Sequence, residues 1–242
     1  MKVTLLSELS RDFIEESIDK MYVAARTCYS ANTCADLIDD ACNRKTIPQK
    51  IELISKVLES GHHSIAEHVN ISFTIDSISR SCSHQLIRHR LCTYSQQSQR
   101  YVNFSNKSFN YVIPPDIAQT FSTSNDLCRK YVDLMTKIKE FYDDAVEAGI
   151  KAEDARYVLP NAACTNIVVT TNLRNLIHIL GLRCCTRAQW EIRAVYRELS
   201  KQLKHAFPFI EKYLDANCVQ LGYCPEGHKS CGRFPSLKEL QK

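Results

Sequence analysis

The chain has 242 residues, of which 44% are apolar and 24% charged, with 6 glycines and 7 prolines. This composition excludes collagen-like and disordered chains, and a chain of this length buries roughly 70–75% of its unfolded surface on folding. No run approaches the ~20 apolar residues of a membrane helix, and a net charge of +4 is too small to indicate a particular partner.

Twelve cysteines are the unusual feature of the composition. In a small secreted protein they would indicate a disulfide framework, but this chain is long and residues 1–13 lack the apolar stretch of an export signal. Cys128 and Cys164 lie within apolar periodic segments, as small hydrophobic residues do. We therefore expect a reduced, cytoplasmic protein.

Hydrophobic periodicity predicts the elements of the first hundred residues. Apolar positions recur at helical spacing over 11–29, and a second helix begins at Pro48 and stops at Gly61. Strict alternation over 69–76 is typical of a half-buried strand. We also expect a strand over 3–6, a helix over 78–90 and a polar loop over 93–100.

Longer elements are predicted in the second half of the chain. A long amphipathic helix starts at Leu127 and ends before Gly149, and a β-branched strand over 167–170 leads into another helix. That helix has one apolar face, consisting of Leu173, Leu176, Ile177 and Leu180. The last long helix is expected to turn Trp190, Ala194, Leu199 and Leu203 inward.

The element order indicates the fold class. Helices around a few non-adjacent strands are typical of an α+β (mixed α/β) protein, and we expect a central, mostly antiparallel sheet flanked by long helices. No repeat or linker divides the chain. We predict a single domain over 1–217, followed by a cysteine-containing tail over 218–242.

The densest polar cluster begins with Arg88, His89 and Arg90 and continues through a hydroxyl- and amide-rich segment to Arg100. Guanidinium groups match phosphate geometry. Two of them ~6 Å apart at an effective dielectric of ~20 repel by roughly 3 kcal/mol, which a bound phosphate would offset. The alternative is a solvated basic surface on which the arginines lie apart.

A second cluster is rich in histidine. His63 and Glu67 are four residues apart, with His62 and His68 beside them, which suggests a metal site. The spacing differs from the HExxH arrangement of zinc enzymes. We favour a turn in which histidine and Ser64 side chains bind a ligand or the backbone.

The helix with the apolar face also carries polar groups. Arg174 and His178 are one turn apart on a different face, and Asn172 precedes them. Taken alone, this is an ordinary amphipathic helix with a structural histidine.

The tail contains another set of possible metal ligands. Its candidate ligands Cys218, Cys224, His228 and Cys231 lack paired CxxC spacing, so a structural zinc is the weaker interpretation. No glycine-rich phosphate loop or dinucleotide fingerprint is present. A nucleotide cofactor must therefore be held by side chains and helix ends.

Together these segments closely resemble the flavin-dependent thymidylate synthases. The family hallmark is Arg-His-Arg, seven residues and then Ser, which matches Arg88-His89-Arg90 and Ser98. The likeness continues at 61–68, 79–85, 172–174, 182–183 and 188–192, and so spans about residues 20–205.

The resemblance implies an enzyme that converts dUMP to dTMP. Methylenetetrahydrofolate would be the carbon donor, reduced FAD the hydride carrier and NADPH the reductant. It also implies a homotetramer with FAD in clefts where subunits meet. We expect no metal ligand, nucleic-acid partner or membrane contact.

The resemblance also assigns site residues. Positions that match flavin contacts are His62, Ser64, Arg88, His89, Arg90, Gln96, Asn172, Arg174 and His178. Positions that match dUMP contacts are Gln85, Arg88, Gln96, Ser98, Gln99, Arg100, Arg156 and Arg183.

Chemistry suggests roles for some of these residues. Arg183 is expected to be catalytic, because a guanidinium beside N3 and O4 favours the ionised, enolate-like uracil. Arg100 and Arg156 would anchor the phosphate. Ser98 is expected to position substrate, since no adjacent base is evident to activate it.

Two positions depart from the family pattern. Thr93 keeps the hydroxyl that many relatives carry as Ser. Gln96 is neutral where some relatives have Glu, so it can form hydrogen bonds but carries no charge.

Two other classes of function stay open. A nucleic-acid-binding module would use Arg88, Arg90 and Arg100, with Tyr94 and Tyr101 as stacking faces. A structural protein would bind zinc through the cysteine-rich tail. The order of the motifs favours the flavoenzyme.

Overall fold

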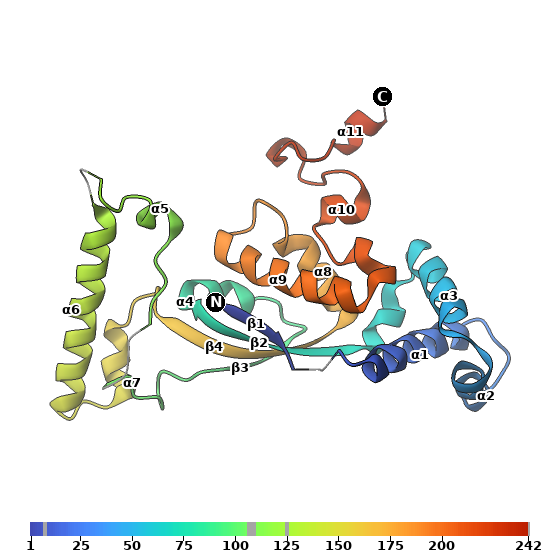
Figure 1. Ribbon diagram of the computed structural model, residues 1–242, viewed down its shortest axis with the longest axis horizontal. Coiled ribbons are helices and arrows are strands. Elements are labelled where there is room, and N and C mark those ends of the chain that lie inside the picture. Colours follow the sequence, from blue (N-terminus) through green and yellow to red (C-terminus); the bar gives the residue numbers. More distant parts are fainter. Residues whose placement is uncertain (7–8, 106–109, 124–125, 242) are drawn as a thin grey trace. The chain divides into compact units, whose positions relative to one another are not determined.

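The fold is built on a four-stranded antiparallel sheet, seen in a computed structural model that describes residues 1–6, 9–105, 110–123 and 126–241 (Figure 1). The strands lie in the order β1-β2-β4-β3. Their bounds are β1 Lys2–Leu5, β2 Asn70–Ser79, β3 Thr93–Gln96 and β4 Cys164–Asn172. Helix predominates over strand, which confirms the predicted helix-rich α+β class.

Helices occupy most of the remaining described chain. They are α1 Arg11–Thr27, α2 Cys34–Asp39, α3 Ile47–Glu59, α4 Arg80–Leu86, α5 Pro115–Ala118, α6 Leu127–Glu147, α7 Ala152–Ala155, α8 Leu173–Arg183, α9 Trp190–Ala206, α10 Asn217–Leu221 and α11 Leu237–Leu240. A π-helical turn spans Asp40–Arg44, and 3₁₀ turns span His63–His68, Arg156–Val158, Pro208–Tyr213 and Gly227–Lys229. Within the described ranges, every helix is too short or too polar to cross a membrane.

The chain forms two compact units. The smaller unit contains residues 1–2, 75–88 and 94–168, and the larger unit contains residues 3–74, 89–93 and 169–242. This division leaves the predicted domain boundary at 217 untested, and helix α10 crosses that position.

Strand β2 shows why the alternating pattern is informative. Ile71, Phe73 and Ile75 are fully buried and their neighbours are more exposed, as predicted for a strand with one covered face. At Ser77 the backbone φ is +58°, and the next buried residue is Ile78 rather than position 77. An irregular residue of this kind shifts the alternation and bends the strand.

The segment after β2 corrects the sequence prediction. The predicted helix over 78–90 is wrong in its bounds, because the strand continues to Ser79, whose hydroxyl caps α4 by accepting from the Cys82 amide. Helix α4 ends at Leu86, so Arg88-His89-Arg90 lies in the turn that follows. The predicted loop over 93–100 begins instead with strand β3. The helix starts later than predicted because Ser79, in extended conformation, is its N-cap.

In the larger unit, α8 and α9 pack against each other (Figure 1). The predicted apolar face of α8 is fully buried, and Asn172 caps its first turn by accepting from the Asn175 amide at 2.8 Å. Helix α9 is rotated from the prediction, since Trp190 and Ala194 are half-buried. Its most buried positions are Ile192, Val195, Tyr196, Leu199 and Leu203.

In the smaller unit, α6 packs against α5 and α7. Its buried residues are Cys128, Met135 and Tyr142. Each of them follows an apolar residue that stays exposed: Leu127, Leu134 and Phe141, with exposed fractions of 44%, 52% and 59%. The apolar stripe of this helix is therefore wider than the face that the chain itself covers.

Candidate active site

The centre of the candidate site in the larger unit is a hydrogen bond between Arg183 and His89. Arg183 is the last residue of α8, and its Nε donates to Nε2 of His89 at 2.9 Å. The accepting nitrogen must carry no proton, so His89 is neutral here. The pKa of His89 is lowered to about 4, first by burial and then by the charges of Arg183 and His178. The ring of His89 also contacts the ring of Tyr196 edge-on, at 6.3 Å between centroids.

Helix α8 carries two more of the predicted flavin-binding residues, Arg174 and His178, and Asn172 is its N-cap. Arg174 is half-buried and His178, one turn later, is exposed. Because Asn172 Oδ1 is used in capping the helix, the amide NH₂ group is the part of that side chain left to serve a ligand. The structure thus places Asn172, Arg174 and His178 on α8 and its N-cap, and it gives Asn172 a structural role as well.

The 3₁₀ turn His63–His68 packs against α8 and explains the histidine cluster. His62 and Ser64, both predicted to contact flavin, are exposed on this turn. The half-buried member is His63, whose Nδ1 is buried and has no hydrogen-bond partner among the described residues. Burial lowers the pKa of His63, and the nearby charge of Arg174 lowers it further. Sequence reasoning named His63 only as a possible metal ligand and left it out of the flavin contacts, because only packing distinguishes it from its neighbours.

Several cations of the candidate site lack an acidic partner. Within the described ranges, no ion pair includes Arg90 or Arg174 of the larger unit. Arg174 also lies beside the unpartnered His63 Nδ1. These groups fit an anionic ligand that accepts hydrogen bonds, such as a diphosphate-bearing flavin cofactor.

In the smaller unit, Arg100 and Arg156 both bind Glu153. Arg100 Nε donates to Glu153 Oε2 at 2.8 Å, and Arg156 Nε donates to the Glu153 carbonyl at 3.0 Å. The Arg100 side chain is 55% exposed, so this ion pair is worth about 0.2–1 kcal/mol. Hydrogen bonds to a charged group contribute about 1.5–3 kcal/mol each, so a phosphate can compete for these arginines.

Arg80 is a further cation that sequence reasoning did not include. It is half-buried at the start of α4, and its pKa is lowered by burial and then by the charge of Arg156. Its position in the segment 79–85, which carries part of the family resemblance, was the available signal. Glu153 gave no signal, because nothing in its local sequence places it between arginines.

The segment around Ser98 is held by its own polar contacts. Ser98 Oγ accepts from the Arg100 amide at 3.1 Å, and Gln96 Nε2 donates to Thr165 Oγ1 at 3.2 Å. Asn166 fixes the loop further, since its carbonyl accepts from the Gln97 amide at 2.9 Å. These contacts are consistent with positioning by Ser98.

A cavity of about 240 Å³ opens beside this segment in the smaller unit. Gln99 lines it together with Gln97, Ser77 and Asn166. Gln85 is half-buried on α4 of the same unit, and Arg88 is exposed in the turn that follows α4. The predicted dUMP residues of this unit are thus distributed over α4, the turn after it, β3, the loop after β3 and the turn after α7.

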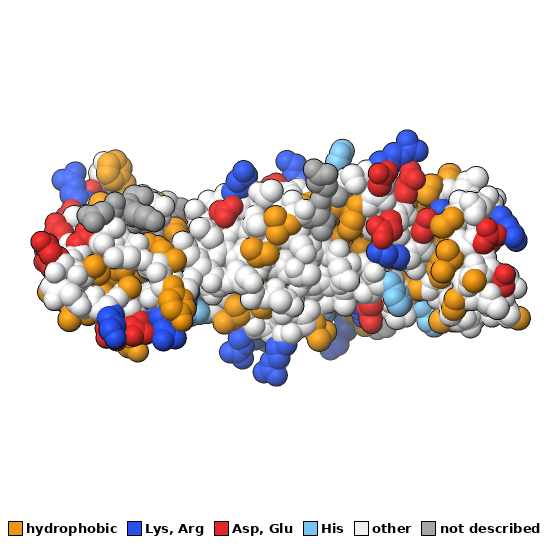
Figure 2. All heavy atoms as spheres, turned by 90° about the horizontal axis from the view of Figure 1, so that it is seen from below, with side chains coloured by type: hydrophobic (Ala, Val, Ile, Leu, Met, Phe, Trp, Pro, Cys, Tyr) orange, Lys and Arg blue, Asp and Glu red, His pale blue; other side chains and the backbone are white. Residues whose placement is uncertain are grey.

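The alternative functions find less support. On the face drawn in Figure 2, Lys and Arg side chains form separate groups, with acidic and apolar groups between them. A nucleic-acid-binding module needs a continuous basic track. In the described ranges, no three His, Cys, Asp or Glu side chains are grouped as metal ligands.

Comparisons with known proteins agree with the resemblance. The pattern of the family described as thymidylate synthase complementing protein matches residues 11–209. A flavin-dependent thymidylate synthase of Geobacter sulfurreducens is 41% identical over 90% of both chains, and one of Nitratidesulfovibrio vulgaris is 42% identical over 93% of this chain and 94% of its own. One of Thermococcus kodakarensis is 47% identical over 72% of both chains.

The depressed pKa of His89 predicts a loss of stability in acid. Between pH 6.5 and about 4, the unfolded chain binds a proton at His89 that the folded chain does not, so falling pH favours unfolding. We expect the urea midpoint to fall between pH 7 and pH 5, and His89→Gln to reduce that fall. Glutamine offers Arg183 an oxygen acceptor but does not titrate.

His63 contributes in the same direction, so the pH dependence of the His89→Gln variant should be weaker but not absent. An equal fall in the midpoint for both proteins would contradict the assignment of a neutral, half-buried His89.

Proposed function

Because the chain belongs to the family of flavin-dependent thymidylate synthases, we propose that its two groups of cationic side chains hold the anionic flavin and nucleotide on which this family acts. The protein is an FAD-dependent enzyme that makes dTMP by reductive methylation of dUMP, with methylenetetrahydrofolate as carbon donor. The larger unit supplies the groups for the flavin and for the uracil ring, and the smaller unit supplies most of those for the rest of the nucleotide.

Flavin binding is assigned to Arg90, Arg174, His178, Asn172 and His89 in the larger unit. Two observations support this assignment. Arg90 and Arg174 lack an acidic partner within the described ranges, and α8 and its N-cap carry further polar groups. Arg88 of the smaller unit, Gln96, and the exposed His62 and Ser64 complete the proposal. When bound, the reduced flavin supplies the hydride, and the protein supplies orientation and charge.

The single observation that carries the proposed catalysis is the bond from Arg183 to His89. It occupies Nε of the guanidinium and so fixes the plane of the group. A planar guanidinium with a fixed orientation is suited to two acceptors on one edge of a ring, such as N3 and O4 of uracil. Arg183 then favours the ionised form of the ring, which makes C6 a better site for hydride.

Arg100 and Arg156 are proposed to hold the phosphate of dUMP. Arg100 binds the Glu153 carboxylate through a solvent-screened ion pair that an incoming phosphate can replace, and Arg156 donates to the backbone carbonyl of the same residue. Gln85, Arg88, Gln96, Ser98 and Gln99 are assigned to positioning the nucleotide. Much of the rate would come from this positioning.

We also propose NADPH as the reductant, a cytoplasmic location and a homotetramer with flavin where subunits meet. The free state of all twelve cysteines is compatible with a reducing compartment. The family match ends at residue 209, which supports a synthase domain over 1–217 and a separate tail over 218–242. The tetramer is supported by the exposed apolar stripe Leu127, Leu134 and Phe141 on α6.

Two substitutions should separate substrate chemistry from cofactor binding. Arg183→Ala is expected to lower dTMP formation by about 10²–10³-fold, the usual cost of losing a donor at developing charge, while FAD stays bound. Arg174→Ala is expected to raise the flavin dissociation constant by about 10–100-fold, because it removes a charge-assisted contact. Steady-state assays and flavin fluorescence titrations measure these effects.

Arg129→Ala is the matched control, since Arg129 is an exposed cation on α6. It should change neither quantity. Loss of flavin from Arg183→Ala, with no effect of Arg174→Ala, would show that the two roles are misassigned.

The oligomer proposal predicts that charge on the α6 stripe disrupts assembly. Leu134→Glu should shift the protein to a smaller species in size-exclusion chromatography with light scattering, because a carboxylate would be buried against an apolar partner. Thr136→Glu lies about 200° away around the same helix and is the control. A tetramer that survives Leu134→Glu unchanged would place the interface elsewhere.

A further inference from the structure

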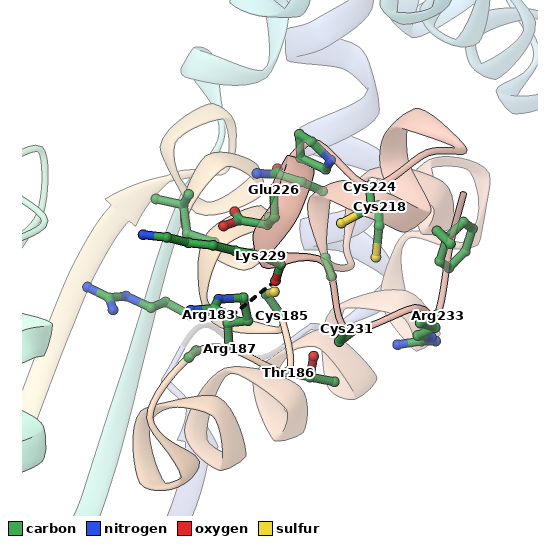
Figure 3. A pocket seen from close by; sticks show the side chains of 17 residues that line it. Arg183, Cys185, Thr186, Arg187, Cys218, Cys224, Glu226, Lys229, Cys231 and Arg233 are labelled. Atoms are coloured by element: carbon green, nitrogen blue, oxygen red, sulfur yellow. Dashed lines mark hydrogen bonds between the residues drawn. The ribbon is translucent and has the colours of Figure 1, made fainter. Parts of the chain in front are cut away.

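The tail of the larger unit is fastened to the end of α8 and encloses a cavity of about 390 Å³ (Figure 3). Helix α10 approaches α8 at Gly181, where an added Cβ would lie 2.1 Å from Asn217 Oδ1. Gln220 Nε2 donates to the carbonyls of Asp215 at 2.6 Å and Tyr213 at 3.0 Å. The cavity is therefore formed by ordered, packed chain.

Four cysteines line this one cavity. They are Cys185, Cys218, Cys224 and Cys231, and Figure 3 shows them on separate segments around it. Cys224 is buried, and burial raises the pKa of the Cys218 thiol, with Cys185 and Cys224 close enough to raise it further. The Cys218 thiol is therefore protonated at neutral pH and is a poor nucleophile.

Cys231 differs from the other three. It is exposed at the cavity, and its pKa is lowered, first by a hydrogen bond with the Thr186 side chain and then by one with the Arg233 backbone. The charge of Arg233 acts in the same direction. Since thiolates rather than thiols attack disulfides, Cys231, which is exposed and has a lowered pKa, is a better nucleophile than Cys218.

The lining of the cavity is strongly cationic. Arg183, Arg187, Lys229 and Arg233 are opposed by one acidic residue, Glu226. Arg187 Nη1 donates to the Lys229 carbonyl at 3.0 Å, which fixes the turn that carries Lys229 (Figure 3). A cavity with this charge favours a small ligand that bears carboxylates.

We propose that this cavity binds small anionic disulfides of the glutathione disulfide class and that Cys231 exchanges with them. The Cys231 thiolate attacks one sulfur of the small disulfide, so a new S–S bond forms at Cys231 while the original S–S bond breaks. The departing half leaves as a thiolate and takes a proton from water. Cys231 is oxidised and the departing half is reduced, so no other oxidant is required.

The exchange is independent of the proposed function. Because Arg183 also lines the cavity, a carboxylate-bearing adduct should in addition lower dTMP formation. That consequence rests on the role given to Arg183, whereas the adduct itself is detected by mass alone. Failure of one therefore does not imply failure of the other.

The test is to expose the reduced full-length protein to glutathione disulfide or to cystamine, which is cationic, and to quantify adducts at each cysteine by peptide mass. Cys28 and Cys42 are also exposed and serve as internal references. We expect Cys231 to react with glutathione disulfide at least about tenfold faster than either reference. The ratio of the rate with glutathione disulfide to the rate with cystamine should be larger at Cys231 than at Cys28 or Cys42. This difference should become smaller in ~0.5 M salt, which screens the charges.

Two variants complete the test. Cys231→Ser should remove the fast adduct, and Lys229→Gln, a change at an exposed side chain, should slow it by about two- to fivefold while leaving Cys28 unaffected. Equal rates at Cys231 and Cys28, or an equal preference for the two reagents, would overturn the proposal.

Discussion

The hydrogen bond from Arg183 to His89 is the interaction on which the candidate site depends. It joins the end of α8 to the turn after α4, two segments that are 94 residues apart. The bond requires a neutral imidazole, because a protonated His89 would place two positive charges in contact in a half-buried place. The low pKa of His89 is thus a condition for holding the guanidinium of Arg183 in one orientation.

The cationic side chains of the smaller unit are held in a different way. There the Glu153 carboxylate forms a partly solvent-exposed ion pair with Arg100, and its backbone carbonyl accepts a hydrogen bond from Arg156. Such contacts stabilise the arginines without binding them tightly. Arg90 and Arg174, by contrast, have no acidic partner within the described chain. The arrangement suits an enzyme whose cofactor and substrate both carry phosphate.

Sequence reasoning succeeds where one short-range signal dominates. The apolar face of α8 and the alternation in β2 follow from burial on one side of a regular element. It fails where neighbours in space decide, as for the rotation of α9. The prediction of a single helix over 78–90 failed for a similar reason. Strand β2 passes directly into α4 at the N-cap Ser79, without a loop that would mark the boundary, and Arg88-His89-Arg90 lies beyond the end of that helix. Likewise, His63 and Glu153 acquire their significance only through contacts with distant segments.

The central claim is that these cations serve an anionic flavin and an anionic nucleotide. The absorption spectrum of the protein with added FAD, recorded with and without dUMP, tests it most directly. We expect a bound flavin spectrum that survives removal of excess FAD and changes when dUMP is added. Protein that retains no flavin and shows no response to dUMP would contradict the claim.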